Sequence, residues 1–293
     1  MTRFPRPGLI TNKRMMLDMK AGNIQRRTTV LLAAGVAITV NLFAAQPYKA
    51  IVVKEGGTIS GVVRLLGKAP RLGFDITKDN DWCGTTKKSP RLVVGEENGV
   101  ANTVISIEGI VEGKKHVSGG KYVLDQRKCE YVPHALLLPM GSPLEIVNSD
   151  AVLHNVHTYE GNGRTVFNIA QPIKGVRFPV KASQFAVPGA YHATCDAGHP
   201  WMSAYVIAME HPYYAITDAN GKFELKDVPP GTYKLTMWHE GVNVARTEWD
   251  GKKAKAYYYE PPYEEIREVV VQPNGNILVD FMLELRPAAI VKN

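Results

Sequence analysis

The stretch TDANGKFELKDVPPGTYKL, residues 217–235, decides the fold class of this chain. Apolar and polar residues alternate over 222–225 and again over 232–238, which is the period of a half-buried β-strand. The Asn-Gly pair at 220–221 and the Pro-Pro-Gly at 229–231 are turn signals. The stretch therefore predicts consecutive short strands joined by tight turns.

The same pattern continues on both sides of this stretch. From Tyr48 onward, alternating runs are separated by Gly, Pro, Asn and Asp, and almost no stretch has a helical period. A second Asn-Gly pair, at 274–275, also lies between candidate strands, and each of the two Asn-Gly pairs predicts a β-hairpin. We therefore expect an all-β protein. The candidate strands are 58–66, 91–94, 103–107, 135–138, 144–147, 190–194, 205–209, 222–225, 232–238, 268–271 and 277–285.

The charge of the chain is concentrated at its N-terminus. The 293 residues include 35 Lys and Arg against 28 Asp and Glu, a net charge of +7. Residues 1–45 contain seven of the basic residues and one acidic residue, which leaves 28 basic against 27 acidic residues in the remainder. No nucleic-acid partner is expected, because the part of the chain predicted to fold has almost no basic excess.

The first 45 residues have the pattern of a targeting segment. A basic region is followed by the apolar run 30–45 and then by Gln46-Pro47, as in a secretory signal. We expect export to the periplasm or the cell surface. The run is shorter than the roughly 20 residues of a spanning helix. Its end, Leu-Phe-Ala-Ala at 42–45, is a poor cleavage site, so an uncleaved membrane anchor is the alternative.

The chain has three cysteines, Cys83, Cys129 and Cys195. In an oxidising compartment an odd number leaves one thiol without a partner. We expect Cys195 to be the unpaired cysteine, because a histidine and a methionine follow it closely. Cys83 and Cys129 are then predicted to form a disulfide, although spacing alone leaves the other pairings open.

The loop CDAGHPWM, residues 195–202, combines a thiol, an imidazole and a thioether in Cys195, His199 and Met202. Two further histidines, His154 and His157, lie upstream. Two His, one Cys and a weak axial Met form the ligand set of blue-copper sites. Zinc and an inert buried thiol are the alternatives, but Met is a poor zinc ligand. His154 and His157 point to opposite faces of a strand, so we predict His154 as the ligand and His157 as the alternate.

Two groups of motifs resemble two known β families. GTISGVVR at 57–64, together with 217–235, resembles the carboxypeptidase regulatory-like, transthyretin-like β-sandwich. The part between them, about 112–212, is similar to cupredoxins such as plastocyanin and amicyanin. The matching pieces are 133–143, 144–150, His-Asn-Val at 154–156 and VPGAYHATC at 187–195. As a whole the chain resembles exported bacterial proteins labelled as methylamine-utilisation proteins.

The resemblance implies a cupredoxin-like Greek-key sandwich inserted into, or packed beside, a transthyretin-like β-sandwich. Insertion at an exposed hairpin tip is tolerated because the ends of the insert can lie close together. The expected parts are a signal peptide or anchor, the first part of the regulatory-like sandwich, the copper domain, and the second part of that sandwich. Their ranges are 1–45, 46–111, 112–212 and 213–293.

By the same resemblance, one copper ion is bound by four ligands, Asn155 hydrogen-bonds across the site and Trp201 shields it from water. The four ligands are His154, Cys195, His199 and Met202. The spacing departs from the family, because three residues separate the loop Cys and His where most type 1 sites have two. It matches the closing half of a copper-A loop, but Tyr191 stands where the second cysteine of that site belongs. A mononuclear site with perturbed geometry is therefore expected.

These features predict an exported electron carrier and no enzyme. The expected partner is a redox protein, such as a cytochrome or a copper- or quinone-containing enzyme. A copper-delivery protein and a non-catalytic cell-surface binding module are the alternatives. Cupredoxin-type enzymes need a second copper centre, and the remaining histidines include no His-x-His pair. The sequence also has no nucleophile elbow and no paired-carboxylate motif.

Overall fold

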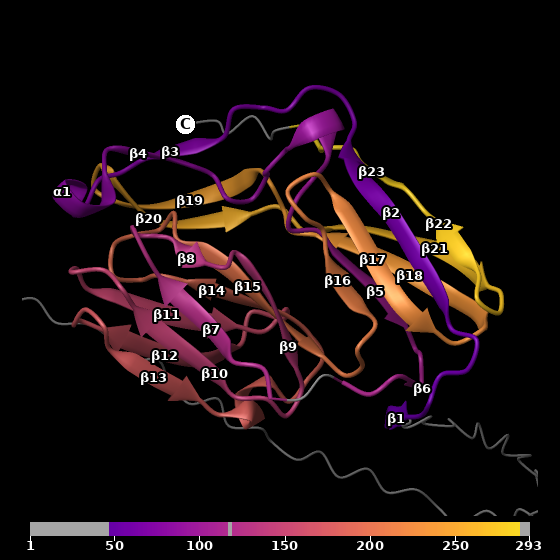
Figure 1. Ribbon diagram of the computed structural model, residues 1–293. Coiled ribbons are helices and arrows are strands. Elements are labelled where there is room, and N and C mark those ends of the chain that lie inside the picture. Colours follow the sequence, from indigo (N-terminus) through magenta and orange to yellow (C-terminus); the bar gives the residue numbers. More distant parts are fainter. Residues whose placement is uncertain (1–46, 117–118, 288–293) are drawn as a thin grey trace, which may run out of the picture. The chain divides into compact units, whose positions relative to one another are not determined.

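Nearly all regular secondary structure in the described residues is β-strand (Figure 1), which confirms the all-β prediction. The computed structural model describes residues 47–116 and 119–287. The predicted targeting segment 1–45 lies outside these ranges. Within them the only α-helix is α1, Asn80–Cys83, and two 3-10 turns cover Glu96–Asn98 and Ala182–Phe185. No helix of the described part is long and apolar enough to cross a membrane.

One β-sandwich contains strands from both ends of the described chain. One of its sheets has the order β16-β5-β18-β21, and the other has the order β17-β2-β22, with β23 also paired to β2. Alternate residues of β2 are buried along its whole length, as its sequence pattern predicts. The strands are β2 (Gly57–Leu65), β5 (Val104–Glu108), β16 (Tyr214–Ile216), β17 (Lys222–Val228), β18 (Gly231–His239), β21 (Tyr263–Val271), β22 (Asn276–Leu278) and β23 (Phe281–Leu283).

The second β-sandwich has a core of its own that includes Leu124, Ile146, Val156 and Ala193. A five-stranded sheet has the order β12-β11-β14-β15-β9, and a four-stranded sheet has the order β13-β10-β7-β8. Each sheet contains one parallel pair, β15 with β9 and β10 with β7. The strands are β7 (Tyr122–Gln126), β8 (Tyr131–Val132), β9 (Ala135–Pro139), β10 (Leu144–Asn148), β11 (His154–Tyr159), β12 (Thr165–Gln171), β13 (Arg177–Val180), β14 (Gly189–Thr194) and β15 (Ser203–Met209).

The second sandwich is inserted between two neighbouring strands of the first. β5 ends at Glu108 and β16 begins at Tyr214, yet the two strands pair directly and antiparallel. The chain between them forms β7 to β15, so the insertion leaves the sheet of the first sandwich intact. Ile76 and Cys83 pack in the second core although they precede the insertion. The domain boundaries given above stay a prediction.

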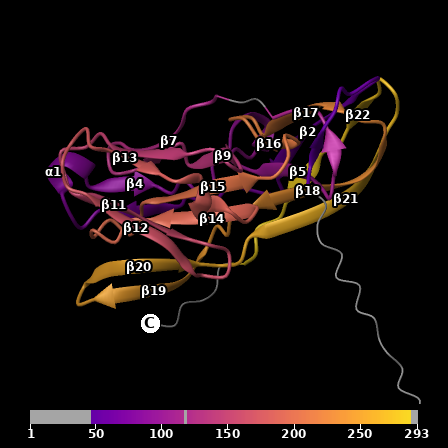
Figure 2. The same cartoon turned by 90° about the horizontal axis from the view of Figure 1, so that it is seen from below.

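Three two-stranded sheets complete the fold. Two are small: β1 (Lys49–Ala50) with β6 (Glu112–Gly113), and β3 (Gly73–Asp75) with β4 (Thr86–Lys88), which flank α1. The third, β19 (Val244–Asp250) with β20 (Lys253–Tyr259), forms a long arm. Figure 2 shows this arm running beside the sheet that contains β11 and β14. Residues of β11, β14 and β20 line one cavity, so the arm lies over the sheet that contains β11 and β14.

Two local predictions are wrong. The strand expected at 91–94 is absent, because only Val94 forms a bridge, to Val100. Both Asn-Gly turns form, with φ of 76° at Gly221 and 52° at Asn274, but neither joins a hairpin. Each leads from one sheet of the first sandwich to the other, where β17 and β22 pair with β2.

Candidate metal centre

Three donor atoms converge inside the second sandwich. His154 is the first residue of β11, Cys195 directly follows β14, and His199 lies in the loop that leads to β15. Their exposed fractions are 0%, 2% and 0%. Nδ1 of His154 lies 3.2 Å from Nδ1 of His199, and Sγ of Cys195 lies 4.0 Å and 3.6 Å from these two nitrogens. The three atoms therefore form a small buried triangle.

The size of this triangle fits a metal ion. With metal–nitrogen bonds of about 2.0 Å and a metal–sulfur bond of about 2.3 Å, planar trigonal coordination needs edges of about 3.5 Å between nitrogens and about 3.7 Å from nitrogen to sulfur. The observed edges of 3.2, 3.6 and 4.0 Å scatter around these values. One ion can therefore contact all three donors.

Strand register and loop geometry explain why the donors meet. β11 and β14 are antiparallel, with His157 opposite Thr194, so the start of β11 lies beside the loop that follows β14. Gly198 has a φ of 89°, a conformation that favours glycine, and the backbone N–H of Met202 donates to the carbonyl of His199. These features turn the loop back toward β11.

Each histidine binds a carboxylate through the nitrogen that faces away from the triangle. Nε2 of His154 lies 2.9 Å from Asp150, and Nε2 of His199 lies 2.9 Å from Asp79. A carboxylate accepts the Nε2 proton, so the lone pair of Nδ1 points to the other donors. Such carboxylate–histidine pairs hold imidazole ligands in many metal sites. Both rings thus present Nδ1 to the triangle.

Burial keeps the three donors uncharged in the absence of a metal. Burial lowers the pKa of His154, although the Asp150 carboxylate opposes this shift. Burial, with the neighbouring His154 ring, lowers the pKa of His199 to about 4. Burial also raises the pKa of the Cys195 thiol to about 11. Neutral imidazoles are ready to coordinate, whereas the thiol must lose its proton to a metal that binds there.

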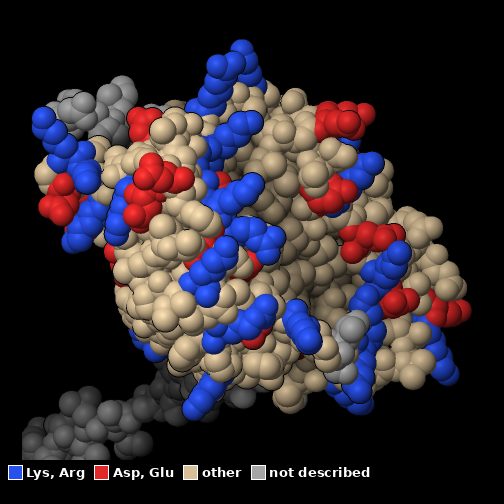
Figure 3. Space-filling model, turned by 60° about the vertical axis from the view of Figure 1, so that its left-hand side comes forward, with Lys and Arg blue, Asp and Glu red and all other residues tan. Residues whose placement is uncertain are grey.

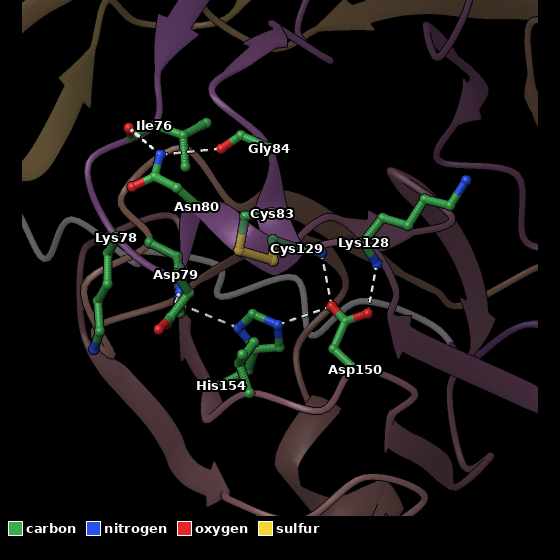
Figure 4. Close-up of a disulfide and its surroundings, with 12 residues drawn as sticks. Ile76, Lys78, Asp79, Asn80, Cys83, Gly84, Lys128, Cys129, Asp150 and His154 are labelled. Carbon is green, nitrogen blue, oxygen red and sulfur yellow. Dashed lines mark hydrogen bonds and ion pairs between the residues drawn. A yellow bond between two sulfur atoms is a disulfide. The ribbon is translucent and has the colours of Figure 1, made fainter.

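A segment from outside the second sandwich covers the site. Asp79 and α1 lie between β3 and β4, and the disulfide between Cys83 and Cys129 bonds this segment to the inserted sandwich (Figure 4). The predicted disulfide is therefore confirmed. Nζ of Lys78 donates to the carbonyl of Ala197 at 2.5 Å, which adds a second attachment. The segment accounts for the complete burial of His199.

The disulfide region also holds Asp150. Its carboxylate accepts the backbone N–H groups of Lys128 and Cys129, each at 2.7 Å, next to His154 in Figure 4. Burial alone would raise the pKa of Asp150, but these hydrogen bonds and those from Trp82 and His154 lower it. Asp150 therefore stays ionised beside the imidazole. Cys129 also lies near Asp150 and His154, but its sulfur is used in the disulfide.

Asn155 makes the hydrogen bond to the loop that the resemblance implies, and Trp201 packs beside His199. Oδ1 of Asn155 accepts the backbone N–H of Ala197 at 3.0 Å, which holds the loop to β11. The Trp201 side chain is 3% exposed, and its ring centre lies 5.2 Å from that of His199. Tyr131 adds a contact that sequence analysis missed, because its hydroxyl donates to the carbonyls at both 155 and 194. These groups pack around the loop that carries Cys195 and His199.

His157 lies outside the triangle. Its Nδ1 is 2.6 Å from Asp196 and its Nε2 is 2.9 Å from Thr165, so both ring nitrogens have other partners. Met202 is 1% exposed and lies in the same core as Cys195. The geometry thus favours His154 over His157, and Met202 as the fourth ligand stays a prediction.

Exposed side chains of both charges lie near the covered site, among them Lys78, Asp81 and Asp196. Figure 3 brings forward the side of the molecule that carries α1 and shows a band of Lys and Arg side chains crossing it. Besides Lys78, Lys128 donates to Asp150 through its backbone, and Lys174 lies 5.5 Å from the ring centre of Trp82.

Comparison with known proteins gives partial matches. The family model described as polysaccharide lyase family 4, domain II, matches residues 187–258. This is not a transthyretin-like family, so that resemblance stays a prediction. No curated protein matches the chain.

Solved structures similar to parts of this chain include several copper proteins. A purple cupredoxin from Nitrosopumilus maritimus is 25% identical, covers 30% of this chain and 100% of its own, and has a TM-score of 0.26. Amicyanin from Paracoccus versutus is 20% identical over 32% of this chain and 85% of its own, with a TM-score of 0.26. A copper-containing nitrite reductase from Thermus scotoductus is 22% identical over 34% and 24%, with a TM-score of 0.27.

Proposed function

We propose that the protein is an exported electron carrier that binds one copper ion through His154, Cys195, His199 and Met202. The observation that carries the proposal is the buried triangle of one sulfur and two Nδ1 atoms, with a carboxylate behind each imidazole. This set of soft sulfur and imidazole donors suits copper. The bound ion would supply a one-electron redox couple.

The residues around the triangle favour electron transfer over catalysis. The donors are almost fully buried, so no open coordination position faces solvent, as a catalytic metal would require. The carboxylates, the loop hydrogen bond from Ala197 to Asn155 and the disulfide-bonded segment restrict movement of the ligands. A rigid ligand set reorganises little when one electron is added or removed, which suits a carrier.

Rigidity also argues against the copper-delivery alternative. Delivery needs ligands that exchange readily, whereas His199 is covered by Asp79 and by a segment with a disulfide. A disulfide supports export, because such bonds persist in oxidising compartments. The proposed partner is a redox protein, such as a cytochrome or a copper- or quinone-containing enzyme.

Copper loading tests the proposal. The purified protein is titrated with Cu(II), and its absorption and electron paramagnetic resonance spectra are recorded beside those of three variants. We expect one copper per chain and an intense thiolate-to-copper band that Cys195→Ser abolishes, Met202→Leu shifts, and His157→Gln leaves unchanged. Copper that binds equally well to Cys195→Ser, or no reversible one-electron reduction of the copper form, would contradict the proposal.

A further inference from the structure

A large cleft lies between the arm and the five-stranded sheet, next to Cys195. Its volume is about 710 Å³, and it is lined by residues of β11, β14, β15, β18, β20 and the start of β21. This volume falls in the range of about 300–1,000 Å³ that is typical of small-molecule sites. Thr194, Cys195 and Asp196 form part of its wall.

Aromatic rings dominate the lining of this cleft. The sheet side contributes Tyr159 and Tyr205, β18 contributes Trp238, and the arm contributes Tyr257 and Tyr258. The rings of Tyr205 and Trp238 meet edge to face with centres 5.1 Å apart, so they form one continuous wall. Two facing walls of tyrosine and tryptophan suit a flat ring, which can stack on one wall and contact the other.

The charged groups of the cleft are mostly acidic. Asp196 and Glu264 are exposed residues of the lining, and Asp196 also lies 2.6 Å from Nδ1 of His157. Glu160, another lining residue, accepts a hydrogen bond from Arg164, which is not part of the lining. The only lysine of the lining, Lys255, bonds to Glu248 at 2.6 Å. A bound cation would therefore find carboxylates, whereas an anion would find no free positive group among the lining residues.

Two cations near the cleft are already neutralised or bound. Arg91 lies behind Tyr205, with 5.8 Å between its guanidinium and the ring centre, and is paired with Glu240 at 2.5 Å. Arg246 lies 3.7 Å from the ring centre of Tyr258. The second contact shows that a ring of this wall accepts a positive charge on its face. Among the described residues no Lys or Arg lies over Trp238.

We propose that this cleft is a binding site for a small organic cation that carries a planar aromatic ring. The ring stacks between Trp238 and the tyrosines of the arm, and the positive group faces Glu264 and Asp196. Recognition by ring faces and carboxylates together explains why both are concentrated here. Binding requires no metal, so the proposal does not depend on the copper site, although the ligand would lie against the strand end that carries Cys195.

Calorimetric titration of the metal-free protein at neutral pH tests this proposal with four matched probes. Tyramine has the ring and the charge, 4-ethylphenol has the ring alone, propylamine has the charge alone, and 3-(4-hydroxyphenyl)propanoate has the ring with the opposite charge. We expect tyramine to bind about tenfold more tightly than 4-ethylphenol, and the other two more weakly still. Equal affinity for the anionic probe, or no heat from tyramine, would overturn the proposal.

Variants locate the binding site. Trp238→Leu should weaken tyramine and 4-ethylphenol alike, by about tenfold, because it removes a stacking face. Glu264→Gln should weaken tyramine alone. Trp249→Leu, on the arm but outside the lining, is the control and should change neither. Because Glu264 is exposed, we expect Glu264→Gln to fold even if Trp238→Leu does not. Unchanged tyramine affinity in Glu264→Gln would refute the predicted orientation of the positive group.

Discussion

Asp79 accepts a hydrogen bond from Nε2 of His199 at 2.9 Å, although 120 residues separate the two in sequence. The contact joins a segment that precedes the inserted sandwich to a donor within it. It fixes the tautomer of His199 and closes the side of the ring that would otherwise face solvent. Asp79 itself has a φ of 51°, so the backbone adopts an uncommon conformation where this contact is made.

Removing the charge of Asp79 should weaken metal binding. In Asp79→Asn the ring loses its anionic partner, so Nδ1 becomes less basic and less well oriented. We expect the affinity for Cu(II) to fall about ten- to a hundredfold, the usual cost of losing such a partner. Competition with a chelator of known affinity measures the change. Asp81→Asn, an exposed residue of the same helix, is the control; an equal loss there would point to disturbance of α1.

Opening the disulfide should loosen the cover over the site. The bond between Cys83 and Cys129 closes a loop with a sequence separation of 46, and replacing both cysteines by serine should lower the free energy of unfolding by roughly 4 kcal/mol on the chain-entropy treatment. Copper should also pass faster to an external chelator, because Asp79 and the backbone donors of Asp150 lose their anchor. Stopped-flow transfer measures this rate, and an unchanged rate would show that the segment does not limit access.

How much of the site could be predicted depended on separation along the chain. Cys195 and His199 share one loop, and His154 begins a strand whose motif resembles a known family, so all three could be found from sequence. Asp150 lies only four residues before His154 and within a quoted motif, yet its contact was not predicted. Asp79 gave no signal, because its role depends on folding of a distant segment over the site.

The strands were easier to predict than their pairing. Alternation of apolar residues depends on burial of one face, and it identified β2 and β18 directly. The Asn-Gly pair at 220–221 specified a turn but not the sheet of the next strand, because a turn fixes only a few dihedral angles. Residues 91–94 do not form the strand that was expected there. They include Arg91, whose side chain is fully buried because it contacts Glu240 and Ser203, which are distant in sequence.

Loss of Glu240 should destabilise the contact between the two sandwiches. Its carboxylate lies 2.5 Å from Nη1 of Arg91, and Nη2 of Arg91 donates to Ser203 of β15 at 2.8 Å. In Glu240→Ala a buried guanidinium is left uncompensated, so the free energy of unfolding should fall by about 3–5 kcal/mol. Urea denaturation measures the loss. Glu268→Ala, at an exposed position of β21, should change it by less than about 0.5 kcal/mol.

The same polar cluster should make the protein less stable in acid. Burial alone would raise the pKa of Glu240, but Arg91 and His134 lower it from 4.5 to about 2. Its contribution is present above pH 4.5 and is lost as the pH falls toward 2. Burial and Arg91 lower the pKa of His192 from 6.5 to about 3, so this ring stays neutral in the folded protein while the unfolded chain takes up a proton.

The lowered pKa values of Glu240 and His192 affect stability in the same direction. Below the ordinary pKa of each group, the unfolded state binds more protons than the folded state. The free energy of unfolding should therefore fall steadily as the pH is lowered from 6.5 to 3. His192→Gln should make the upper part of this decline, between pH 6.5 and 4.5, less steep, while the lowered pKa values of His154 and His199 maintain the rest of it. The contribution of Glu240 at lower pH should be unchanged. Urea midpoints across this pH series measure both effects, and a midpoint that rises on acidification would refute the neutral state of His192 in the fold.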